Sequence, residues 1–198
     1  MFELLFRITD EQNYLMLLSE CSFDQGGDIS GFFDMNVNGY HHGHYHNYPL
    51  QPGEQGLESI TSWFILFIYA YHELNHSGYV AISDVESPIS WIEFKKNDDM
   101  VAINLIRADK PDGTLELRTK PFEQCEYNLW YIQYIKDGIQ HDELVDRRNE
   151  SVNLKKFRKE LIRKASQYLE ELQEINPKLM YNRNVAELEL LVSNLIQN

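Results

Sequence analysis

One long apolar segment limits what this chain can fold into more than any other feature of its sequence. Residues 57–76 read LESITSWFILFIYAYHELNH, which is long enough for a helix that Ser59 or Thr61 can cap and Gly78 can end. Apolar residues lie on nearly all sides of this helix, so we expect it to be buried against a sheet. Its β-branched residues leave a strand as the alternative for part of the segment. The apolar run at 63–71 is far shorter than the roughly 18 residues of a membrane span.

Segments on both sides of this helix have the composition and alternation of β-strands. Before it, FELLFRI, NYLMLLSE and FFDMNV predict three strands, at 2–8, 13–20 and 32–37. The last of these leads into Asn38-Gly39, which suits the two positive φ angles of a type I′ hairpin turn. After it, four segments separated by turn residues predict a meander: YVAIS, ISWIEFKK, MVAINLIR and TLELR.

The C-terminal quarter of the chain has the periodicity of helices. Apolar residues recur at helical spacing from Leu154 to Pro177, and a shorter helix is predicted from Val185 to Ile196 with Asn184 as its N-cap. Residues 126–142 fit a helix or a strand equally well. The sequence therefore predicts a single α+β domain over residues 1–198. It combines a mainly antiparallel sheet, a buried central helix and a helical C-terminal part at about residues 150–198.

The charge distribution indicates what kind of partner the chain can bind. The formal net charge is −13, and the first sixty residues hold nine acidic residues against one basic residue, Arg7. This acidity argues against nucleic acid or an anionic membrane and favours a basic protein as partner. Cys21 and Cys125 match no metal or redox motif, and the N-terminus has no secretory signal pattern, so we expect free thiols and a cytoplasmic protein. The sequence does not predict an oligomeric state.

Four of the seven histidines occur in the segment YHHGHYHNYP, residues 40–49. If the segment is extended, His42, His44 and His46 share one face of the strand. A His-x-His pair on a strand can hold zinc or non-haem iron. The alternative is a solvent-facing loop or edge strand whose tyrosines and histidines form a recognition surface. Neighbouring imidazolium charges disfavour one another, so either arrangement predicts a pH-sensitive surface.

The segment HELNH, residues 72–76, resembles the HExxH motif of zinc peptidases. Histidines four apart on a helix share one face, so His72 and His76 can ligate zinc while Glu73 activates the bound water. The sequence offers no clear third ligand. The alternative is that both histidines lie on the buried face of the helix, hydrogen-bonded to neighbouring groups. We therefore favour neither a metal nor a catalytic residue, and keep zinc at His72 and His76 with Glu73 as general base as the alternative.

Residues 78–106 follow the predicted helix with a short strand, a turn with Asp84, Ser87 and Pro88, and a hairpin that carries Trp91. This pattern resembles small bacterial immunity proteins that neutralise polymorphic or contact-dependent toxins. It implies a cytosolic, non-enzymatic protein that binds a toxin domain and blocks its active site. We therefore predict an acidic interaction protein that binds a basic toxin domain, and a zinc-dependent hydrolase as the alternative. The predicted partner-binding residues are Asp24, Asp28, Asp34, Tyr40, His42, His44, Tyr45, His46 and Tyr48.

Overall fold

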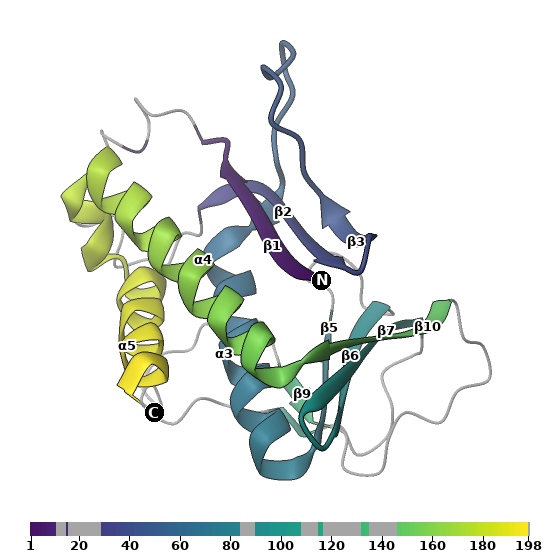
Figure 1. Ribbon diagram of the computed structural model, residues 1–198. Coiled ribbons are helices and arrows are strands. Elements are labelled where there is room, and N and C mark those ends of the chain that lie inside the picture. The colour runs from purple at the N-terminus through teal and green to yellow at the C-terminus, as the bar shows by residue number, and fades with distance from the viewer. Residues whose placement is uncertain are drawn as a thin grey trace. The chain divides into compact units, whose positions relative to one another are not determined.

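The fold is α+β with antiparallel sheets, as the sequence predicts. The computed structural model describes residues 1–10, 15, 29–83, 90–107, 115–116, 132–134 and 146–197. Within these residues the strands form two sheets, and the chain divides into two compact units (Figure 1). The first unit combines Met1–Ile68 with Lys156–Asn198, and the second is Tyr69–Lys155. That the whole chain forms one domain stays a prediction.

The strands divide between the two units, and helices follow the last strand of each unit in the chain. The strands of the first unit are β1 (Phe2–Ile8), β2 (Ser30–Val37), β3 (Tyr40–His44) and β4 (Glu58–Ser59). The helices are α3 (Ile60–Ser77), α4 (Leu154–Ile175), a 3₁₀ helix (Pro177–Tyr181) and α5 (Arg183–Gln197). The strands of the second unit are β5 (Tyr79–Ser83), β6 (Ser90–Asn97), β7 (Met100–Arg107), β8 (Leu115–Glu116), β9 (Ile132–Tyr134) and β10 (Asp146–Asn153).

β2 is the central strand of the first sheet. β1 pairs along one side of it, with Phe6 opposite Phe33, and β3 pairs along the other. The short strand β4 pairs with the start of β2. The strands predicted from FELLFRI and FFDMNV are therefore confirmed, whereas NYLMLLSE lies outside the described residues except for Leu15.

Aromatic side chains form the core of the first unit. Phe33 of β2 contacts the rings of Trp63, Phe64 and Phe67 on α3, with centroid distances of 5.3 to 5.8 Å. Phe64 also lies 5.4 Å from the ring of Tyr168 on α4. The part of α3 inside this unit is thus buried between sheet and helix, which confirms the buried central helix.

The helices end close to where the sequence predicts. Gly78, at φ 80°, follows the last residue of α3, and its N–H binds the carbonyl of Leu74. At α5 the predicted N-cap is wrong, because the Oδ1 of Asn182 accepts the N–H groups of Asn184 and Val185. Asn182 therefore occupies the capping position, and Asn184 lies within the first turn. In the described part of the chain, no helix is both long and apolar enough to cross a membrane.

The second sheet has the strand order β10-β7-β6-β5-β9-β8. The predicted meander is confirmed for β5, β6 and β7, but the fourth predicted strand, which contains β8, does not lie next to β7. β10 occupies that position instead. Its sequence DRRNESVN has almost no apolar residues, so the alternation that reveals a strand is missing. Within the ambiguous residues 126–142, the described part is the strand β9.

A buried glutamate is fully hydrogen-bonded within the second sheet. Glu93 is 1% exposed, and its carboxylate accepts hydrogen bonds from the hydroxyl of Tyr79 and the amide of Asn104, both at 3.0 Å. Lys95 lies 2.9 Å from the same carboxylate. A buried charge needs such partners to offset the loss of hydration, so this cluster is a structural network of the sheet.

Candidate functional site

The candidate site begins at an edge strand of the first sheet. We call residues 40–48 the histidine segment. It starts with the β2–β3 hairpin, in which Asn38 and Gly39 have φ angles of 53° and 94°, so the predicted turn is confirmed. The strand ends at His44, and the chain then leaves the sheet. His42 and His44 therefore lie on the strand, whereas His46, which was predicted to share their face, lies beyond its end.

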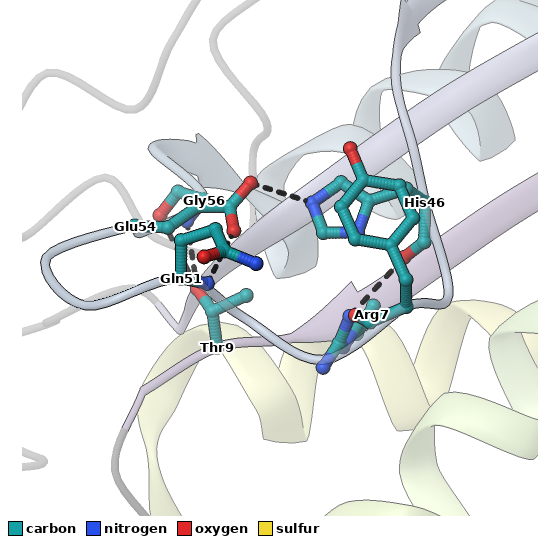
Figure 2. Close-up of polar contacts among 7 residues, drawn as sticks. Arg7, Thr9, His46, Gln51, Glu54 and Gly56 are labelled. Carbon is teal, nitrogen blue, oxygen red and sulfur yellow. Dashed lines mark hydrogen bonds and ion pairs between the residues drawn. The ribbon is translucent and has the colours of Figure 1, made fainter.

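The chain that follows β3 is bound to β1 (Figure 2). Nη1 of Arg7 donates hydrogen bonds to the carbonyl oxygens of His46, at 3.3 Å, and Tyr48, at 2.7 Å. The hydroxyl oxygen of Thr9 accepts the N–H of Gly56 at 3.0 Å. Arg7 of β1 and Thr9, which directly follows β1, thus hold both ends of the loop that carries the second half of the histidine segment.

Inside this loop, His46 and Glu54 form a close pair. Nε2 of His46 lies 2.8 Å from Oε1 of Glu54, and Oε2 of Glu54 accepts the N–H of Gln51 at 2.7 Å (Figure 2). The hydrogen bond from Gln51 and the neighbouring His46 lower the pKa of Glu54 from its ordinary value. The carboxylate is therefore charged at neutral pH and accepts the Nε2 hydrogen.

Aromatic rings stack around His46. The ring of Tyr48 is nearly parallel to the imidazole at a centroid distance of 3.7 Å, and Phe32 of β2 lies 4.6 Å away. His44 is also close, at 5.6 Å. His46 itself is 7% exposed, whereas Tyr48 is 53% exposed. The loop therefore buries an imidazole and presents a tyrosine ring to solvent.

A second histidine pairs with a buried acid on the same sheet. Nδ1 of His41 lies 2.6 Å from Oδ2 of Asp34, whose side chain is 2% exposed, while that of His41 is 56% exposed. Oδ1 of Asp34 is buried and has no hydrogen-bond partner among the residues that the structure describes. The exposed imidazole of His41 thus pairs with one oxygen of a buried carboxylate.

The structure brings most of the predicted partner-binding residues together on or beside β3. Asp24 and Asp28 lie outside the described residues. The others are exposed at Tyr40, His44 and Tyr48, half-buried at His42 and Tyr45, and buried at Asp34 and His46. Their role in binding a partner stays a prediction.

Sequence reasoning missed three contributors to this arrangement: Arg7, His41 and Glu54. Arg7 and Glu54 contact His46, and His41 contacts Asp34 on the neighbouring strand. Two of the three carried a local signal: His41 belongs to the histidine-rich segment itself, and Glu54 follows the Pro-Gly turn at residues 52–53, eight positions after His46.

The HELNH segment lies at the end of α3. His72 and His76 are both exposed and Glu73 is half-buried, so the alternative that placed the histidines on a buried face is wrong. Partial desolvation lowers the pKa of His72, which favours its neutral form. Among the residues that the structure describes, no three His, Cys, Asp or Glu side chains lie close enough to hold a metal ion together.

The Glu54 contacts predict a pH-dependent contribution to stability. The lowered pKa means that Glu54 stabilises the folded protein at pH values above its ordinary 4.5, and that this contribution disappears as pH falls through the lower folded value. Glu54→Gln should therefore destabilise the protein at neutral pH, with the difference from wild type shrinking in acid. Urea unfolding from about pH 7 to about pH 3 measures this. Glu170→Gln, at an exposed position of α4, is the control. A Glu54→Gln effect that is equal at every pH would contradict the assignment.

Comparison of this chain with protein-family models, with curated proteins and with solved structures found no match.

Proposed function

We propose that this protein is a non-enzymatic, cytoplasmic interaction protein of the immunity type, which binds and neutralises a basic toxin domain. The binding surface is the histidine segment together with the loop that ends at Gly56. The observation that carries the proposal is the way this loop is fixed: Arg7, Thr9 and Glu54 hold its backbone while Tyr48 remains exposed.

A fixed loop of this kind favours binding because little conformational entropy is lost on association. Tyrosine is among the residues that most often anchor protein interfaces. Tyr40 and Tyr48 are 39% and 53% exposed, and both belong to the histidine segment. The stacking of Tyr48 on His46 fixes the orientation of the exposed ring before any partner arrives.

The charge of this region supports a basic partner. Nine acids and one base lie in the first sixty residues, and the one base, Arg7, is engaged with the backbone of the loop. An acidic surface accelerates association with a basic protein, and salt weakens that attraction. Toxins that cleave nucleic acids need basic surfaces to bind phosphates, so they fit this charge.

The test is capture followed by measurement with the purified partner. Wild type and a His44→Ala/Tyr48→Ala variant are used in parallel as bait, and the proteins retained by either bait are identified and purified. We expect a basic protein whose affinity falls with rising salt and is at least about 30-fold weaker for the variant, as for an interface hot spot of about 2 kcal/mol. When expressed alone it should arrest growth, and co-expression of this chain should relieve the arrest.

Two outcomes would remove the proposal. One is a purified partner that binds wild type and variant equally, which would place the interface elsewhere. The other is an affinity that does not change between low and high salt, which would remove the electrostatic argument. Unfolding of the variant must be measured alongside, so that a folding defect is not taken for a binding defect.

A second candidate is a zinc-dependent hydrolase that uses HELNH. It is favoured by one observation: His72 and His76 are exposed and four residues apart on α3, so their nitrogens are accessible to an ion. In that case Glu73→Gln should keep bound zinc but abolish hydrolysis. Activity that survives this substitution would remove Glu73 as general base.

A further inference from the structure

Among the described residues, one nitrogen of His46 is buried without a hydrogen-bond partner. The Glu54 carboxylate can only accept, so the hydrogen of the neutral imidazole is on Nε2, which lies 2.8 Å from Oε1. Nδ1 then carries a bare lone pair. Nδ1 is buried, as is the side chain as a whole at 6% exposure, and it has no partner within the part of the chain that the structure describes. A buried acceptor left without a donor is costly, so its presence calls for an explanation.

The surroundings of His46 match those of a metal-ligating histidine. Such residues usually donate their second ring nitrogen to a carboxylate, which fixes the tautomer and the orientation of the ring. Glu54 has this position, and it is itself held by the N–H of Gln51 (Figure 2). Phe32 and Tyr48 pack against the ring and restrict its rotation. The orienting groups of a metal ligand are therefore already in place.

His44 is near enough to His46 to be a second ligand. Zinc sits about 2.0–2.1 Å from a histidine nitrogen, so the ring centroids of two histidines that share an ion lie about 5–6.5 Å apart. The rings of His44 and His46 have a centroid distance of 5.6 Å. Because His44 is exposed, its side chain can change rotamer when an ion binds.

We propose that His44 and Nδ1 of His46 bind a divalent transition-metal ion of the zinc type, with Glu54 orienting His46. Imidazole nitrogens suit zinc, copper and nickel, and exclude magnesium and calcium as the preferred ions. Two protein ligands leave coordination positions for water or for a group from a bound molecule. The site goes beyond the proposed partner binding and does not depend on it, because the isolated chain contains both ligands.

Zinc titration of the tag-free, chelator-treated full chain tests the proposal by calorimetry. We expect a single ion per chain and a loss of affinity of at least about tenfold in His44→Ala. Glu54→Gln keeps both ligands but removes the carboxylate, and should weaken binding by about 10- to 100-fold. Glu170→Gln, which removes an exposed carboxylate on α4 away from the site, is the matched control for Glu54→Gln and should bind as the wild type does. Nitrogen NMR of the imidazoles should show zinc perturbing Nδ1 of His46.

Each other result overturns the site. Wild type that binds no zinc would do so directly. Equal binding by His44→Ala and wild type would exclude His44, and loss only in a His72→Ala/His76→Ala variant would move the ion to the HELNH segment. Equal affinity of Glu54→Gln and Glu170→Gln would remove Glu54 as the residue that orients His46. Partner capture is a separate measurement, so failure here leaves the proposed function unaffected.

Discussion

Phe64→Ala is expected to lower the free energy of unfolding by about 3–5 kcal/mol, because it removes the ring at the centre of the first unit. Phe64 is fully buried and contacts Phe6 and Phe33 of the sheet and Tyr168 of α4. The substitution leaves a cavity between β1, β2 and α4, and these elements would have to shift to fill it. A loss of this size is a large fraction of the stability of a typical domain.

Chemical denaturation of the variant measures this effect through the midpoint and slope of the transition. Phe64→Leu should cost clearly less, since it keeps most of the buried volume. Leu190→Ala, at a position on α5 that is 57% exposed, should stay within about 0.5 kcal/mol of wild type. A Phe64→Ala effect as small as that of Leu190→Ala would contradict the central role of this ring.

The same core explains why much of the fold can be predicted from the sequence. α3 is apolar on nearly all sides, and a helix of this kind is stable only when surrounded, here by β2 and α4 in the first unit. β1 and β7 match their predicted segments, because both are short apolar runs with Phe, Val or Ile, which favour strands. β10 was missed for the opposite reason. It is held by backbone pairing to β7, which leaves no trace in its polar side chains.

The candidate site was predictable as a segment but not as a geometry. Regular alternation predicts one face for the three histidines, but β3 ends at His44, so His46 falls outside the alternation. Gly43, at a φ of 127°, lies against the backbone of β2 just before this end. The residues that hold His46 are Arg7, which is distant in the sequence, and Glu54, which lies across the loop. Local patterns carry no information on such contacts, which depend on strand order and on the path of the loop.

Gly56 decides where that loop can lie, and Gly56→Ala is the second substitution with a large expected effect. An added Cβ would lie 2.1 Å from the carbonyl carbon of Gly31 and 2.5 Å from the backbone nitrogen of Phe32. These are backbone atoms of β2, so they cannot give way as a flexible side chain can. The loop must move off the strand instead, at a cost of about 1–3 kcal/mol, the range for overpacked positions.

Movement of the loop should also disassemble the site. Gly56 lies two residues after Glu54, and its N–H donates to the hydroxyl of Thr9, so displacing Gly56 breaks this bond and moves Glu54. We expect Gly56→Ala to weaken both zinc binding and partner binding, and to shift the imidazole signals of His46 in NMR spectra.

Gly53→Ala separates this effect from a general loss of stability. Gly53 lies in the same loop at φ 81°, where alanine is strained by about 1–2 kcal/mol, but its Cβ would meet no atom within 4 Å. The two variants should therefore lose similar stability, while Gly53→Ala keeps the wild-type His46 signals and zinc affinity. Equal disturbance of His46 in both variants would contradict this prediction. It would mean that the conformation of the whole loop positions the site, and not the close approach of Gly56 to Gly31.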